Sequence, residues 1–218
     1  MKILCLYHNP RALELFRWIQ EQGDQVVLHT ERLEPEWCRK QAFDLTVSYT
    51  YRYILSRETL EALGGNAVNL HNSFLPFNRG ADPNIWSILD GTPRGVTLHY
   101  MTPGLDKGNI IAQQLVGACG PEATLESSYE ELDRAAKQLF MDAFAWYGFW
   151  EEMRKEPQGT GSYHSVKDGG FVKELTDTYN IQTAEFTKKY QEVGKLEESL
   201  GRLEVKSCLK REGSLSKI

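Results

Sequence analysis

The sequence predicts an α/β fold: a Rossmann-like, mainly parallel sheet with a short C-terminal extension. Short apolar runs of strand character alternate with segments of helical spacing through residues 2–70. Pro and Gly separate the segments, and strands that alternate with helices indicate parallel pairing through helical crossovers. The 218 residues are 41% hydrophobic, which is enough for one core with a small extension.

The first half predicts four strands with helices between them. The continuous apolar run at 2–7 is typical of a buried parallel strand, and Asn9-Pro10 begins a helix because Pro suits the first turn. Ser56 is expected to cap a later helix, since Ser-Arg-Glu-Thr-Leu places polar groups ahead of the apolar Leu60 and Leu63. The remaining strands are expected at 26–28, 45–47 and 67–70, and a further helix at Pro35.

The second half predicts a helix at 81–89, two strands and a long helix. The strands, 96–101 and 110–116, flank a Gly- and Pro-containing loop. The long helix is expected from Ser128 to about Lys155, with Ser128 and Glu131 as a capping box. A polar helix is expected at 183–200, and residues 201–218 as a poorly ordered or edge segment. We therefore expect a catalytic domain at 1–155 and a C-terminal extension at 156–218.

Composition excludes several classes of function. The net charge of -5 gives no overall attraction to nucleic acid or to an anionic membrane. The four cysteines, Cys5, Cys38, Cys119 and Cys208, are far apart and form no C-x-x-C pair, which indicates a reducing compartment and no zinc site. The N-terminal apolar run is too short for a signal peptide, so we expect a cytoplasmic protein. No G-x-G-x-x-G follows the first strand, which disfavours an NAD enzyme.

Three polar residues stand where a parallel sheet binds ligands. Asn69 and His71 end the fourth strand, and the carboxyl ends of strands form the ligand edge of such sheets. The two residues are two positions apart, so both side chains face the same way. Asp106 lies in the loop between the last two predicted strands.

This set of groups suits acyl transfer to an amine. Asn69 can donate through its amide and His71 through a ring N–H, and such donors stabilise the oxyanion of acyl transfer. Asp106 can accept the proton that the attacking amine must lose. No covalent nucleophile and no metal is required. Taken singly, Asn69 could bond local backbone, His71 could be a structural histidine and Asp106 a turn residue.

Five short motifs occur in order along the sequence: Asn69-Leu70-His71, Ser73-Phe74-Leu75-Pro76, Arg79-Gly80, Gly95-Val96-Thr97 and Asp106-Lys107-Gly108. Together they resemble the folate-dependent formyltransferase family, which includes glycinamide ribonucleotide, methionyl-tRNA and nucleotide-sugar formyltransferases. The similarity is strongest over 66–117 and extends back to Met1. The stretch 78–86, followed later by Gln113, is most similar to small bacterial nucleotide-sugar N-formyltransferases.

The resemblance implies a formyltransferase fold and a role for each matching residue. Asn69, His71 and Asp106 take the places of the catalytic residues, and 10-formyltetrahydrofolate is the implied co-substrate, without a metal. Backbone groups beside Ile54 and Leu55 could hydrogen-bond a flat heterocycle, which agrees with the implied pterin site. The implied folate contacts are Arg52, Tyr53, Ile54, Leu55, Met101, Thr102, Gly104 and Leu105.

The implied acceptor is the amine of a nucleotide-linked amino-deoxy sugar, a precursor of cell-surface polysaccharide such as lipopolysaccharide O-antigen. His8, Arg79 and Trp86 are candidate substrate contacts, although the core is the favoured place for Trp86, and Arg79 could form a salt bridge at the surface or at a helix N-terminus. His99 is expected to be packed rather than catalytic. Relatives often pair, so the resemblance implies a homodimer.

Two alternatives to this acceptor stay open. One is another small amine such as glycinamide ribonucleotide, and the other is a folate-binding protein that has lost catalysis. Transfer RNA is disfavoured as an acceptor, because the family members that use it carry a basic C-terminal domain, whereas here a short mixed-charge tail follows.

Overall fold

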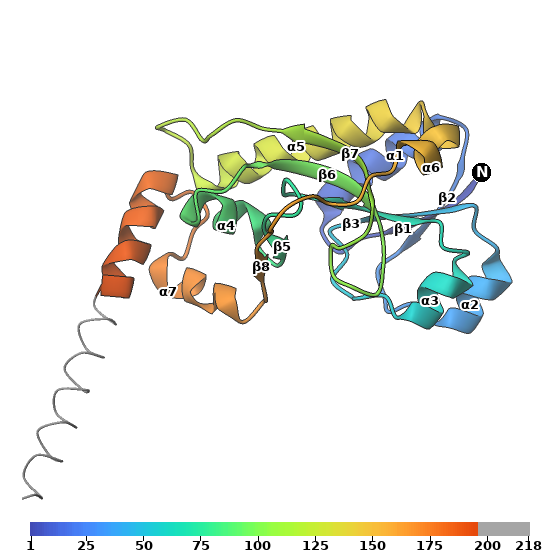
Figure 1. Cartoon of the computed structure of the whole chain (residues 1–218), viewed down its shortest axis with the longest axis horizontal. Helices are drawn as coiled ribbons and strands as arrows, with labels where there is room; N and C mark the ends of the chain where they lie inside the picture. Colours follow the sequence, from blue (N-terminus) through green and yellow to red (C-terminus); the bar gives the residue numbers. More distant parts are fainter. Residues whose placement is uncertain (196–218) are drawn as a thin grey trace, which may run out of the picture.

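A six-stranded sheet forms the centre of the computed structural model, which describes residues 1–195 (Figure 1). The strand order is β2-β1-β3-β4-β6-β7. The first four strands pair in parallel, whereas β6 and β7 pair antiparallel, so the predicted mainly parallel α/β sheet is confirmed. The strands are β1 Lys2–Leu6, β2 Gln25–His29, β3 Leu45–Tyr49, β4 Ala67–His71, β6 Gly95–Tyr100 and β7 Ile110–Leu115.

Helices cover both faces of this sheet (Figure 1). Ile3 and Cys5 of β1 face a core cluster with α1 and α5, while Leu4 and Leu6 face a second cluster with α2 and α3. Burial on both faces explains the continuous apolar run of β1. The helices are α1 Leu13–Glu21, α2 Pro35–Gln41, α3 Arg57–Ala62, α4 Pro83–Leu89, α5 Leu125–Phe144, α6 Trp150–Met153 and α7 Val172–Leu175, with 3-10 turns η1 Pro10–Ala12, η2 Tyr147–Phe149 and η3 Asp168–Phe171.

Two predicted helix starts are confirmed by their capping contacts. The Asn9 side chain accepts a hydrogen bond from the backbone N–H of Arg11 at 3.0 Å, just before Pro10. The Ser56 side chain accepts one from the backbone N–H of Thr59 at 3.1 Å. Each cap satisfies a backbone donor that the first helical turn leaves free.

The long helix differs from its prediction at both ends. Helix α5 begins three residues earlier, with Thr124 and Ser127 as the capping box. Ser128 is instead buried and bonds Asn84, and Glu131 pairs with Arg94. The predicted capping box at Ser128 and Glu131 is therefore wrong, because tertiary partners hold both side chains.

The helix also ends at Phe144 rather than near Lys155. The chain turns back at this point, and the indole of Trp150 donates to the carbonyl of Ala143 at 2.9 Å. Tyr147 and Trp150 then pack edge-on with a ring-centroid separation of 5.0 Å. The spacing of Tyr147 and Trp150 continues the apolar pattern of the helix, which is why the sequence predicts a longer helix. In the structure these two side chains fold back over the helix end.

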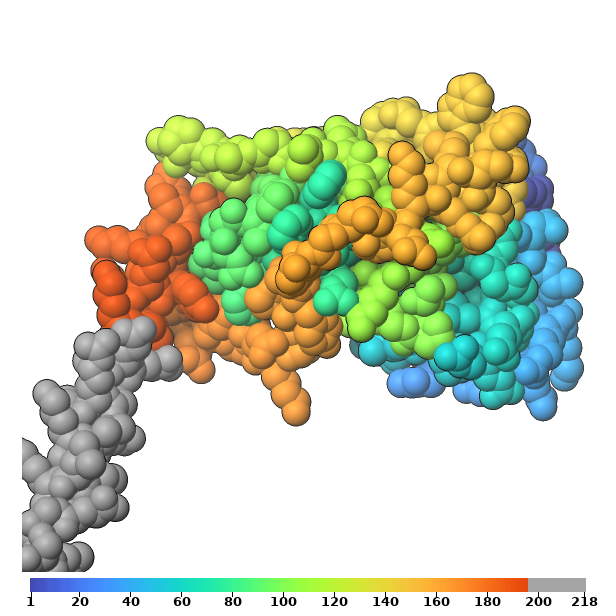
Figure 2. Space-filling view, viewed as in Figure 1, coloured from blue at the N-terminus to red at the C-terminus, as the bar shows by residue number. Residues whose placement is uncertain are grey.

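The segment after residue 155 packs against α4 and α5 (Figures 1 and 2). Strand β8 (Tyr163–His164) pairs with β5 (Arg79–Gly80). Phe186, in the helical stretch 183–195, is fully buried in a cluster with Ile85 and Leu125. Residues 196–200 of the predicted polar helix, the segment 201–218 and Cys208 lie outside the described residues. In the described part of the chain, every helix is too short or too polar to cross a lipid bilayer.

Candidate active site

Asn69 and His99 face each other across neighbouring strands. They are register partners in the antiparallel β4–β6 pair, and Asn69 Nδ2 lies 3.4 Å from His99 Nε2. His99 Nδ1 lies 2.9 Å from the carbonyl of Tyr100, so this nitrogen carries a proton and donates it. His99 Nε2 is then free either to accept from Asn69 or, when protonated, to donate elsewhere.

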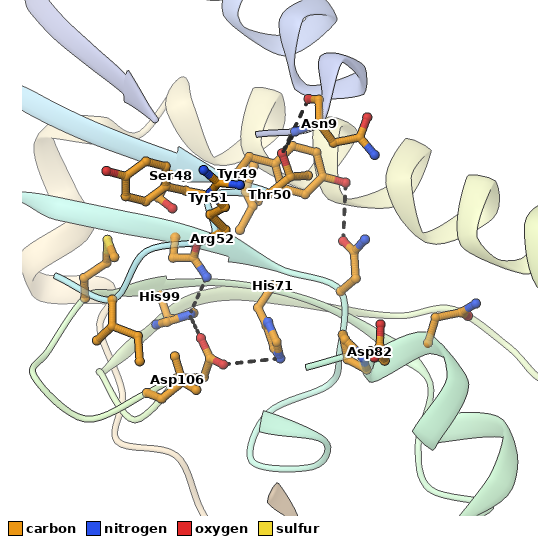
Figure 3. A pocket seen from close by; sticks show the side chains of 18 of the residues that line it. Asn9, Ser48, Tyr49, Thr50, Tyr51, Arg52, His71, Asp82, His99 and Asp106 are labelled. Carbon is orange, nitrogen blue, oxygen red and sulfur yellow. Dashed lines mark hydrogen bonds and ion pairs between the residues drawn. The ribbon is translucent and has the colours of Figure 1, made fainter. Parts of the chain in front are cut away.

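Asp106 lies between the two histidines (Figure 3). Its Oδ1 is 3.5 Å from His99 Nε2, and its Oδ2 is 3.7 Å from His71 Nε2. Oδ2 also accepts a 2.9 Å hydrogen bond from the backbone N–H of Gly80. Asp106 has a positive φ of 50°, a conformation that Asp tolerates better than most residues. The structure thus brings Asn69, His71 and Asp106 together, as predicted.

Burial and charge act in opposite directions on Asp106. Burial of its carboxyl would raise the pKa. The charge of His71, the hydrogen bond and charge of His99, and the Gly80 N–H outweigh burial and hold the pKa of Asp106 well below its usual range. The carboxyl is therefore ionised at neutral pH and is able to accept a proton or stabilise a cation.

His71 has one ring nitrogen engaged. Its Nε2 lies 3.0 Å from the backbone carbonyl of Asn78, which only accepts, so Nε2 carries the proton. The second nitrogen, Nδ1, is left for other partners, and His71 lines the cavity described below. Donation from Nδ1 would require a doubly protonated ring, next to the ionised Asp106.

A cavity of about 740 Å³ opens beside these residues. One wall carries every predicted folate contact and is mainly apolar at Leu55, Met101 and Leu105. Ile54 on this wall is 63% exposed, although isoleucine is usually buried. These lining residues are Arg52, Tyr53, Ile54, Leu55, Met101, Thr102, Gly104 and Leu105.

The cavity is also lined by residues that the sequence does not predict to be there. Arg11 pairs with Glu126 and lies over the ring of Tyr129 at 5.7 Å. Tyr179 comes from the C-terminal segment, about fifty residues beyond Tyr129 in the sequence. Asn72 follows His71 directly and also lines the cavity. No local pattern groups these residues, since four separate segments supply them.

The three predicted substrate contacts do not line this cavity. Trp86 is 6% exposed and stacks on His164 with ring centroids 3.8 Å apart, which favours the core alternative. Arg79 lies in the β5–β8 pair, with its Nε 3.4 Å from the carbonyl of Ser162. His8 Nε2 lies 3.4 Å from Nη1 of Arg52, which itself lines the cavity.

His99 was expected to be packed, and it is 2% exposed. It also contacts both Asn69 and Asp106, a role that the strand pattern alone does not reveal. The antiparallel pairing of β4 with β6 is the signal that places it there. Among the described residues, no group of three or more His, Cys, Asp or Glu side chains is arranged to hold a metal ion.

The sequence and the fold are similar to those of known proteins. The profile of the family described as formyl transferase matches residues 24–144. The formyltransferase PseJ from Anoxybacillus kamchatkensis, solved with UDP-4,6-dideoxy-4-formamido-L-AltNAc and tetrahydrofolate, is 34% identical, with a TM-score of 0.74 over 85% of this chain and 97% of that chain. Rv3404c from Mycobacterium tuberculosis, a candidate sugar N-formyltransferase, is 26% identical, with a TM-score of 0.66 over 77% and 76%. A 4-N formyltransferase from Francisella tularensis, 20% identical with a TM-score of 0.68 over 87% and 86%, shares the fold.

Proposed function

The chain belongs to the formyl transferase family, and we propose that it moves the formyl group of 10-formyltetrahydrofolate to the amine of a nucleotide-linked amino-deoxy sugar. The observation that carries this proposal is the contact of Asp106 with both His71 and His99 beside one large cavity. The likeness to PseJ, whose structure holds a UDP-linked formamido sugar and tetrahydrofolate, supports the choice of both substrates.

The apolar wall fits the folate. A pterin ring needs a flat slot with apolar faces and a few backbone hydrogen bonds at its edge. Leu55, Met101 and Leu105 supply apolar contacts, and the exposed Ile54 side chain offers surface for a ligand to cover. The cavity volume of about 740 Å³ lies within the range of small-molecule sites.

Asn69, His71 and Asp106 are the proposed catalytic residues. As the amine attacks, negative charge develops on the formyl oxygen, and the Asn69 amide and His71 donate hydrogen bonds to it. Since His71 Nε2 is held by Asn78, this donation uses a second proton on Nδ1. Asp106 stabilises that cation and then accepts the proton released by the amine.

We also propose the wider setting of the reaction. The product would serve cell-surface polysaccharide such as lipopolysaccharide O-antigen, made in the cytoplasm without a nucleic-acid partner. The net charge of -5 supports the absence of nucleic acid. A homodimer is proposed because Trp146 and Phe149 are each 59% exposed and offer apolar surface. Sedimentation of the full chain at several concentrations tests the dimer.

The function is tested by an assay with 10-formyltetrahydrofolate and a panel of amines. The panel contains nucleotide-linked amino sugars, glycinamide ribonucleotide and methionyl-tRNA, and release of tetrahydrofolate is followed. We expect fast release with one amino sugar only. Fast release with glycinamide ribonucleotide instead would overturn the acceptor, and folate binding without release on any amine would favour the noncatalytic alternative.

A further inference from the structure

A buried polar chain runs from α5 to the floor of the cavity. Lys137 Nζ lies 2.7 Å from Asp133 Oδ2, and the Tyr49 hydroxyl lies 2.6 Å from Asp133 Oδ1. Tyr49 is 1% exposed, and the Asp133 and Lys137 side chains are 6% and 8% exposed. Lys137 also reaches Glu14 on α1 at 2.6 Å. The last member of the chain is Asn72, which lines the cavity next to His71.

The hydroxyl of Tyr49 has one proton to give, and Asp133 takes it. A carboxylate paired with a lysine only accepts, so the 2.6 Å contact requires Tyr49 to be the donor. Burial, followed by the nearby charge of Asp133, raises the pKa of Tyr49 well above its usual value, so the proton stays in place. The Tyr49 oxygen therefore has only lone pairs left for Asn72.

Asn72 must then turn its NH2 towards Tyr49. The Tyr49 hydroxyl is 3.4 Å from Asn72 Oδ1, and two oxygens without a shared proton repel each other. The oxygen and the NH2 of a side-chain amide have nearly the same size and shape. Their hydrogen-bond partners therefore decide which position holds the oxygen and which holds the NH2. With NH2 towards Tyr49, each donor in the chain meets an acceptor. The Asn72 carbonyl oxygen then faces the cavity.

We propose that Asn72 binds the acceptor by accepting a hydrogen bond from one of its N–H or O–H groups, and that Tyr49 is the positioning residue that orients the Asn72 amide. This inference rests on the proposed function for the identity of the acceptor. Asn72 lines the cavity together with Arg11 and Tyr129. A carbonyl oxygen at this place accepts a hydrogen bond, so it selects an N–H or O–H group of the acceptor. It disfavours a phosphate, which carries only acceptor oxygens and would need the NH2 group instead.

The kinetic test compares Tyr49→Phe with wild type. Loss of the positioning contact is expected to raise the KM for the acceptor about tenfold, the effect of one hydrogen bond, while the KM for folate stays unchanged. In the Asn72→Ala background, Tyr49→Phe should add nothing, because it acts through Asn72. Tyr147→Phe, which loses a hydroxyl contact to Asn66 instead, is the matched control. The proposal would be overturned if Tyr49→Phe kept an acceptor KM within twofold of wild type. It would also be overturned if Tyr49→Phe raised the acceptor KM by the same factor in the Asn72→Ala background.

A second measurement needs no acceptor, and it reads the wild-type protein itself. The side-chain amide resonances of Asn72, assigned by their loss in Asn72→Ala, are observed by NMR in the free wild-type protein. We expect slow hydrogen exchange of the NH2, since it is bonded to Tyr49, and fast exchange would overturn the orientation. If the wild-type protein formylates no amino sugar, the proposed function is wrong. The exchange rate of the Asn72 NH2 still shows whether this group or the amide oxygen faces Tyr49.

Discussion

The backbone N–H of Gly80 donates a 2.9 Å hydrogen bond to Oδ2 of Asp106, across 26 residues of sequence. Gly80 has φ 93°, and a Cβ at this position would overlap the backbone carbonyl oxygen of His164 in the paired strand β8. The β5–β8 pair therefore holds a donor against the carboxylate at the candidate active site.

Gly80→Ala should impair both stability and catalysis. The added methyl group must push β5 away from β8 and move the N–H from Asp106, so we expect a loss of about 1–3 kcal/mol in the free energy of unfolding and at least a tenfold lower kcat. Gly91→Ala is the matched control, because Gly91 also has positive φ (61°) but a Cβ added there would meet no atom of the described residues within 4 Å. Urea unfolding and steady-state assays check both, and equal kcat in the two variants would contradict the role of Gly80.

His99→Phe tests whether His99 serves the site or only fills the core. The change keeps an aromatic ring but removes the contacts to Asn69 and Asp106. A hydrogen bond to a charged group contributes about 1.5–3 kcal/mol, so kcat should fall about ten- to a hundredfold. His29→Phe is the control, since His29 stacks on Trp37 outside the cavity lining. If both variants kept wild-type kcat, His99 would be a packing residue alone.

Ile54→Ala should weaken folate binding without destabilising the protein. The Ile54 side chain is 63% exposed, so its truncation should change the free energy of unfolding by less than about 0.5 kcal/mol. A folate ligand would cover it, and loss of that buried apolar surface should raise the Kd for folate about tenfold or more. Val166→Ala, at 80% exposure away from the cavity lining, is the control. Calorimetric titration with tetrahydrofolate measures this Kd. An unchanged Kd would mean that folate does not bind against Ile54.

The low pKa of Asp106 predicts how its contribution to stability depends on pH. A carboxyl whose pKa is lower in the folded than in the unfolded protein stabilises the fold above its unfolded value, about 3.9, and this contribution is lost as pH falls through the folded value. The difference in unfolding free energy between wild type and Asp106→Asn should therefore be fully present at about pH 5 and shrink below about pH 4. Urea unfolding across this range measures it. A difference that stayed unchanged between about pH 5 and pH 3 would mean that the contacts to His71, His99 and Gly80 do not lower the pKa of the carboxyl.

Local sequence patterns predicted the elements that local chemistry decides. The apolar run of β1, the caps at Asn9 and Ser56 and the placement of Asn69 beside His71 each follow from a few neighbouring residues. The folded protein keeps these local features, because no contact from a distant residue replaces them.

Distant contacts decided the features that were predicted wrongly or missed. Ser128 was expected to cap the long helix, but its side chain instead bonds Asn84, which is 44 residues away in the sequence. His99 joined the site only through the antiparallel pairing of β4 and β6. Tyr179 reached the cavity because its segment packs on α4 and α5, which no local pattern encodes.

The most direct test of the account is the rate of tetrahydrofolate release by wild type and Asp106→Asn, with the preferred amino sugar and 10-formyltetrahydrofolate both saturating. Asparagine keeps the size of the side chain but removes the negative charge and the proton acceptor. We predict unchanged folate affinity and a kcat lower by about a hundredfold to ten-thousandfold. Turnover at the wild-type rate would contradict the assignment of Asp106 and, with it, the proposed active site.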